Sequence, residues 1–147
     1  MPSDLTSPPS AAELAQLKQA FSKDPFSEAY HPLAEAYLLS NSYMEAMVVC
    51  KKGIKAFPGK AEPHILMARI YAAQKKDAKA LDEVKQALER DDSNVDALLL
   101  ASELSYKSGN SGDGADYLKK AQSLEPGRED VQAACQRRGI QPPEPPA

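Results

Sequence analysis

Three consecutive stretches of 34 residues decide the fold of this chain: SEAYHPLAEAYLLSNSYMEAMVVCKKGIKAFPGK over 27–60, AEPHILMARIYAAQKKDAKALDEVKQALERDDSN over 61–94, and VDALLLASELSYKSGNSGDGADYLKKAQSLEPGR over 95–128. When they are aligned, three columns hold small side chains and a fourth holds apolar ones: Ala34, Ala68 and Ser102; Ala46, Ala80 and Gly114; Gly53, Ala87 and Ala121; and Cys50, Val84 and Leu118. Small residues let paired helices approach closely, and larger apolar residues fill the space between them. Recurrence at this period predicts one helical hairpin per stretch.

Almost every segment between residues 10 and 138 has the apolar spacing of a helix, and none alternates like a strand. We predict helices over 10–23, 28–40, 42–57, 62–75, 77–90, 95–108, 112–124 and 128–138. Ser10 with Glu13, and Ser42 with Glu45, fit capping boxes at two helix starts. Gly139 fits a left-handed stop after the last helix.

Two local features depart from an ideal helical hairpin. Pro32 lacks an amide donor, which predicts that its helix begins late or bends. The segment GNSGDG at 109–114 contains three glycines, each of which costs about 1 kcal/mol relative to Ala inside a helix. Because it has neither a preceding strand nor the Lys-Ser or Lys-Thr of a phosphate loop, we interpret it as a locally mobile turn between two helices.

Composition excludes several classes of protein. The net charge of -3 is small and its signs are interspersed, so the chain has no basic stripe for nucleic acid. No leader-like start and no run of about 20 apolar residues is present, which predicts a cytoplasmic protein without a membrane span. Cys50 and Cys135 lack metal-ligand spacing and are expected to be free thiols. Seven of the twelve prolines lie in the tails 1–9 and 139–147, which we predict to be disordered.

The repeated columns resemble the tetratricopeptide family, whose 34-residue signature is W-x2-L-G-x2-Y, then A-x3-F, then P. The matching residues are Tyr30, Leu33, Ala34, Tyr37, Ala46, Cys50 and Pro58 in the first stretch; His64, Met67, Ala68, Tyr71, Ala80 and Val84 in the second; and Leu98, Ala101, Ser102, Leu118, Ala121 and Pro126 in the third. The pattern is broken at Asp92, Ser105 and Gly114, so the third stretch matches least well.

The resemblance implies an all-α domain over 10–138, in which antiparallel helix pairs form a right-handed superhelical array. Helices over 10–23 and 128–138 would cap the three repeats, with Leu14, Leu17 and Phe21 facing inward from the first and Val131 and Cys135 from the second. It also implies that the first helix of each pair lines a concave face, which is the default binding site of the family.

Rotation of about 100° per residue assigns one side of each first helix to this concave face. The predicted partner-binding residues are His31, Glu35, Leu38, Leu39, Ile65, Arg69, Ala72, Leu99, Glu103 and Tyr106. Their mixture of apolar and charged side chains is typical of a recognition surface, in which Glu35, Arg69 and Glu103 would set the register of a partner. An alternative interpretation is that the apolar members only pack between adjacent helices.

No catalytic, metal or cofactor site is predicted. His31 and His64 belong to different stretches and lack the i, i+4 spacing of a helical metal pair. Some tetratricopeptide domains bind a C-terminal carboxylate through Lys, Asn and Arg, but the corresponding residues here offer too little positive charge: His31, Glu35, Leu66, Asp96 and Leu100. We therefore expect a non-enzymatic adaptor or scaffold that binds a helix or peptide of another protein. Self-association, or a regulatory role within a larger assembly, is the alternative.

Overall fold

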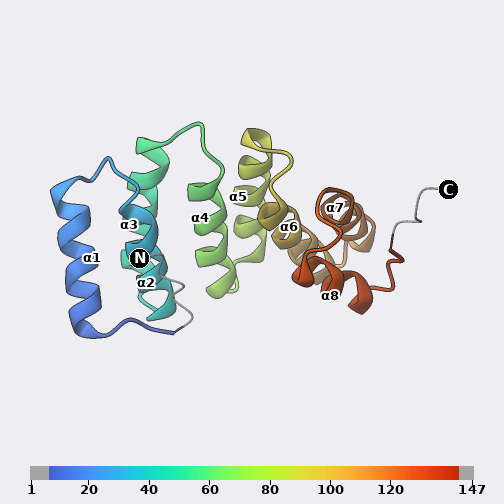
Figure 1. Cartoon of the computed structure of the whole chain (residues 1–147), viewed down its shortest axis with the longest axis horizontal. Coiled ribbons are helices and arrows are strands. Elements are labelled where there is room, and N and C mark those ends of the chain that lie inside the picture. Colours follow the sequence, from blue (N-terminus) through green and yellow to red (C-terminus); the bar gives the residue numbers. More distant parts are fainter. Residues whose placement is uncertain (1–6, 143–147) are drawn as a thin grey trace.

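The computed structural model describes residues 7–142, which form eight helices and no strand (Figure 1). The helices are α1 (Ala11–Lys23), α2 (Tyr30–Leu39), α3 (Tyr43–Ala56), α4 (Glu62–Ala73), α5 (Asp77–Arg90), α6 (Val95–Lys107), α7 (Ser111–Leu124) and α8 (Glu129–Arg137). Each predicted helix is present, with bounds that differ by at most two residues at either end. The predicted disorder of the two tails falls largely on residues 1–6 and 143–147, which lie outside the described residues.

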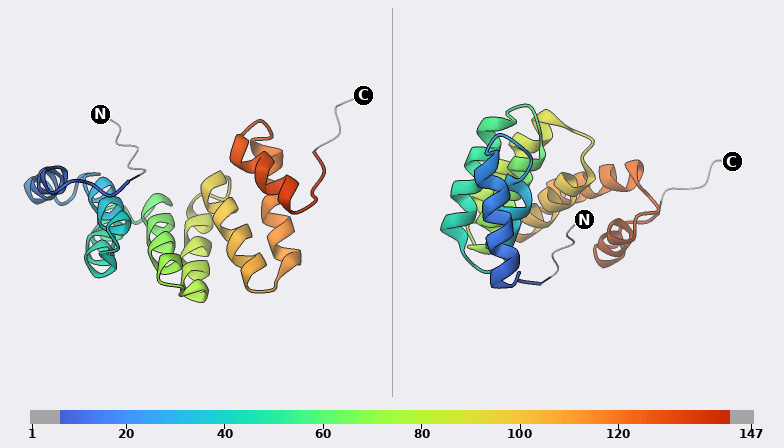
Figure 2. Two further views of the ribbon diagram at one scale, coloured as in Figure 1. Left: turned by 90° about the horizontal axis from the view of Figure 1, so that it is seen from below. Right: turned by 60° about the vertical axis from the view of Figure 1, so that its left-hand side comes forward.

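The helices stand side by side in chain order, from α1 at one end of the molecule to α8 at the other (Figure 1). Helices pair as α2 with α3, α4 with α5, and α6 with α7, and each pair packs on the next. The row bends into an arc when it is viewed from below (Figure 2). This arrangement confirms the predicted all-α, right-handed superhelical array of antiparallel helix pairs.

The hydrophobic core is distributed along the row, as a repeat array requires. One cluster of buried residues lies among α2, α3 and α4, a second among α4, α5 and α6, and a third among α6, α7 and α8. Phe21 of α1 joins the first cluster, with Leu14 and Leu17 packed against it. Val131 and Cys135 of α8 join the third. The two outer helices therefore bury the same faces that the sequence predicts.

The three hairpins turn in the same way. In each pair, the residue that follows the C-cap of the first helix has a positive φ: Asn41 at 60°, Lys75 at 61° and Gly109 at 81°. The next amide donates to a carbonyl five residues back, as in the bond from Ser42 N to Tyr37 O at 2.8 Å. GNSGDG supplies this turn with Gly109 and Asn110 alone, because α7 begins at Ser111 and contains the other two glycines.

Both glycines in the small-residue columns lie against tyrosine rings. A Cβ at Gly53 would stand 2.3 Å from the Tyr30 ring, and one at Gly114 would stand 2.7 Å from the Tyr106 ring. Carbon atoms at rest are about 3.5 to 4.0 Å apart, so neither site has room for alanine without movement. Gly114, which departs from the family pattern, is therefore required by the tyrosine that packs on it.

One predicted cap is present and one is not. The Ser10 hydroxyl accepts from the Glu13 amide at 3.2 Å, and the Glu13 carboxylate accepts from the Ser10 amide at 3.4 Å, which confirms that capping box. The capping box predicted at Ser42 and Glu45 is wrong, since the Ser42 side chain makes no cap bond. The hairpin turn also uses the Ser42 amide in its bond to Tyr37, so this amide is not free for the Glu45 side chain as a capping box requires.

Two further local predictions are confirmed. Gly139 has a φ of 69° and follows α8, as the left-handed stop requires. The helix that contains Pro32 begins at Tyr30, two residues later than predicted, so it begins late. Pro32 is then the third residue of α2, where an amide needs no partner within the helix.

Candidate functional site

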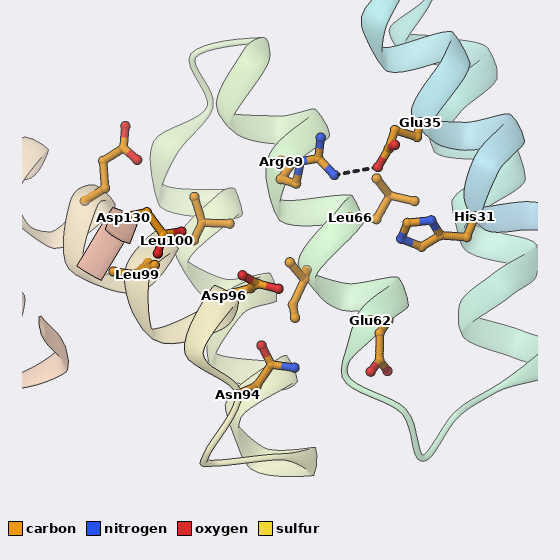
Figure 3. A pocket seen from close by; sticks show the side chains of 12 residues that line it. His31, Glu35, Glu62, Leu66, Arg69, Asn94, Asp96, Leu99, Leu100 and Asp130 are labelled. Carbon is orange, nitrogen blue, oxygen red and sulfur yellow. Dashed lines mark hydrogen bonds and ion pairs between the residues drawn. The ribbon is translucent and has the colours of Figure 1, made fainter. Parts of the chain in front are cut away.

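A cavity of about 580 Å³ opens along the face formed by the first helices of the pairs (Figure 3). Its lining residues come from α2, α4, α6 and α8, with Asn94 from the turn before α6: His31, Glu35, Glu62, Ile65, Leu66, Arg69, Asn94, Asp96, Leu99, Leu100, Glu103 and Asp130. This volume is within the range of known ligand sites. The cavity is large enough to hold several side chains of a bound segment.

Leucine and isoleucine side chains form the apolar part of the cavity. Leu66 is 1% exposed and belongs to the first core cluster. Ile65 and Leu100 are half-buried and pack on the second cluster, and Leu99 packs on the third. Each of these residues therefore packs between helices and also lines the cavity. Packing on the core holds these side chains in place.

An ion pair crosses the cavity wall from α4 to α2. Arg69 Nη1 donates to Glu35 Oε2 at 3.0 Å (Figure 3), and the Glu35 side chain is only 18% exposed. The two residues stand in the same column of adjacent stretches. Arg69 is therefore engaged within the wall, where it links two neighbouring helix pairs.

A second ionic cluster holds α8 against the array. The Arg128 guanidinium donates to Asp96, to Asp130 at 2.7 Å and to Glu125 at 3.2 Å. Hydrogen bonds to Asp96 and then to Asp130 raise the pKa of Arg128 above its ordinary value. One cation thus forms ion pairs with three carboxylates, and two of these, Asp96 and Asp130, line the larger cavity.

A smaller cavity of about 240 Å³ lies between α6, α7 and α8. Its lining includes Leu99, Glu103 and Tyr106 together with Arg137 and Arg138. The Arg138 guanidinium stands 3.9 Å from the centre of the Tyr106 ring, a cation–π contact. Tyr106 therefore packs between Gly114 on one element and Arg138 on another, so its ring is largely engaged.

The structure brings most of the predicted groove residues together. His31, Glu35, Ile65, Arg69, Leu99 and Glu103 line the larger cavity, and Tyr106 lines the smaller one. Leu38 and Ala72 pack instead against the first and second core clusters, and Leu39 is half-exposed outside the lining of these two cavities. His64 is buried, with Nδ1 2.8 Å from a Glu83 oxygen.

The ten predicted groove residues leave out six that line the larger cavity: Glu62, Leu66, Asn94, Asp96, Leu100 and Asp130. A signal for Asp130 was present in the sequence, because Glu28, Glu62, Asp96 and Asp130 are spaced by 34 residues. Extending the repeat by one helix into the C-terminal cap would have found it. Asn94 precedes α6 and is brought to the cavity by the turn between pairs.

Neither a metal-binding group nor a membrane-spanning helix is found among the residues that the structure describes. No group of three or more His, Cys, Asp or Glu side chains within 7–142 is placed to hold a metal ion. None of the helices in this range is long and apolar enough to cross a bilayer.

Helix pairs stacked into an arc, with a cavity across their first helices, define an α-solenoid. Solved structures with the same arrangement include a thermophilic TPR protein in Thermus thermophilus, at a TM-score of 0.80 and 21% identity over 89% of this chain and 73% of that one. MamA aligns at a TM-score of 0.69 and 17% identity over 87% of this chain and 78% of that one. The first TPR of Spaghetti (RPAP3), bound to the HSP90 peptide SRMEEVD, aligns at a TM-score of 0.70 and 18% identity over 75% of this chain and 89% of that one.

These comparisons show that the chain has the tetratricopeptide fold. No family model matches the sequence. No curated protein matches it either.

Proposed function

We propose that this protein is a non-enzymatic adaptor that binds a helix or extended peptide of another protein in the larger cavity. The observation that carries the proposal is an apolar surface, already held by core packing, that opens on the face shared by α2, α4 and α6. Cavities with convergent apolar and polar side chains are the usual sites of ligand recognition. The peptide bound to the RPAP3 domain supports a peptide as the class of ligand.

The test uses peptides selected from a displayed library of random 16-residue segments. Selected peptides are synthesised, and their dissociation constants are measured by titration calorimetry on the unaltered chain, Leu99→Asp and Val48→Asp. Leu99 lines the cavity, whereas Val48 is 54% exposed on α3 and serves as the matched control. A charge placed on the apolar floor should weaken binding at least tenfold, because the buried contact surface carries most of the affinity.

Circular dichroism at 222 nm checks that both variants keep their helical content. Selected peptides that bind Leu99→Asp as tightly as the unaltered chain would remove the cavity from consideration. Sedimentation velocity over a hundredfold range of concentration separates this function from self-association. A concentration-independent monomer is expected, and a dimer that Leu99→Asp dissociates would favour the alternative.

A further inference from the structure

Two columns of the repeat place an acid at the start of each stretch and, in the first and third stretches, a cation at the end. The acidic column contains Glu28, Glu62, Asp96 and Asp130, and the column at the end of each stretch contains Lys60, Asn94 and Arg128. In the first stretch, Lys60 Nζ donates to Glu28 Oε1 at 3.0 Å. In the third, Arg128 donates to Asp96. The cation that ends a stretch therefore neutralises the acid that begins it.

The middle stretch lacks this neutralisation. Asn94 stands where the other stretches have Lys or Arg, and its side chain accepts from the Ala97 amide at 3.0 Å instead. Glu62 is exposed at the start of α4 and has no ion-pair partner among residues 7–142. Its carboxylate lines the larger cavity.

A second carboxylate without an ion pair within 7–142 lies farther along the same face. Glu35, Arg69, Glu103 and Arg137 form another column at intervals of 34 residues. Arg69 bonds to Glu35, and Glu103 forms no ion pair in the described residues. Glu103 is exposed on α6, about two helical turns beyond the level of Glu62 on α4.

The larger cavity is therefore acidic above an apolar floor. Its lining contains five carboxylates and one guanidinium, and that guanidinium already bonds to Glu35. Glu103 also lines the smaller cavity, where Arg137 and Arg138 balance the carboxylates, so the excess of negative charge is confined to the larger cavity. Such a surface attracts cations and disfavours acidic segments.

We infer that the partner is a basic peptide segment, in which Lys or Arg side chains meet Glu62 and Glu103 while an apolar side chain between them contacts Ile65 and Leu99. This inference rests on the proposed function and names the chemistry of its ligand. The chain's own tails do not have this chemistry, because residues 1–9 and 139–147 contain no Lys or Arg. Charge complementarity thus favours a basic segment of a partner protein over either of these two segments.

The displayed 16-residue library tests the inference. Peptides that lose affinity on Leu99→Asp are expected to carry an excess of Lys and Arg over Asp and Glu. Synthetic versions should bind the variant with Glu62→Lys and Glu103→Lys about tenfold more weakly, since two ion pairs of ordinary strength correspond to that factor. Selection against this variant should enrich acidic peptides instead.

The matched control carries Asp82→Lys and Asp116→Lys, two charge reversals at exposed positions on α5 and α7. It changes net charge by the same amount and should weaken the basic peptides by less than twofold. An equal loss in both double variants would mean that only net charge matters, and it would overturn the inference. Cavity-dependent peptides without cationic excess would also overturn it, while the proposed function would stand. A library whose binders all ignore Leu99→Asp would overturn both.

Discussion

The contact between Gly53 and Tyr30 provides the sharpest test of the packing. Ala87 and Ala121 occupy the same column as Gly53, so the sequence alone suggests that Gly53→Ala should stabilise α3 by about 1 kcal/mol through helix propensity. The structure predicts the opposite result. A Cβ at this position would lie 2.3 Å from the ring of Tyr30, which is 3% exposed.

The magnitude follows from how firmly the ring is held. To reach ordinary contact, the ring must move by about 1 Å. Phe57 packs 5.8 Å from the centre of this ring, and residues of α2, α3 and α4 surround it. Overpacking in such cores costs about 1 to 3 kcal/mol, so after the gain in propensity we expect a net loss of up to about 2 kcal/mol.

A double-mutant cycle with Tyr30→Leu isolates the contact. Leu98 occupies the equivalent position in the third stretch, where it faces a helix that carries Ala121. Once the ring is removed, Gly53→Ala should become stabilising by about 1 kcal/mol, which makes the coupling energy about 2 kcal/mol. Urea unfolding followed by circular dichroism at 222 nm measures all four proteins. A Gly53→Ala variant that is more stable than the unaltered chain, or an equal effect in both backgrounds, would refute the predicted steric conflict.

Two further predictions concern helix capping and a buried thiol. Asn94→Ala should lower the free energy of unfolding by about 1 kcal/mol because its side chain caps α6, whereas Ser42→Ala should change it by less than about 0.5 kcal/mol; the two urea midpoints decide. Burial, with a smaller contribution from Glu83, raises the pKa of Cys50 from 9.0 to about 12. The folded state therefore favours the protonated thiol. The contribution of this thiol to the free energy of unfolding is complete below pH 9 and is lost as the pH rises toward 12. The unaltered chain should lose up to about 4 kcal/mol more than Cys50→Val over that range, and parallel stability curves would contradict the assignment.

The order of helices and their stacking could be predicted from the sequence because the forces involved act over short range. Apolar spacing places each helix within two residues of its observed bounds, and a constant period means that each hairpin meets the next in the same way. Ser10 was also predictable, since its cap depends only on the residues that follow it. The capping box at Ser42 was not, because it needs the Ser42 amide, which the preceding hairpin turn bonds to Tyr37.

The tertiary structure alone decided which groups on the cavity face remain available. In the sequence, Glu35, Arg69 and Glu103 occupy equivalent positions in one column of the repeat. Only the fold pairs Arg69 with Glu35 and leaves Glu103 without an ion pair in the described residues. It also turned Tyr106 toward Gly114, so a residue predicted for binding has a packing role. The physical reason is that side-chain neutralisation and close packing depend on distances between separate helices, whereas helix position depends on neighbours along the chain.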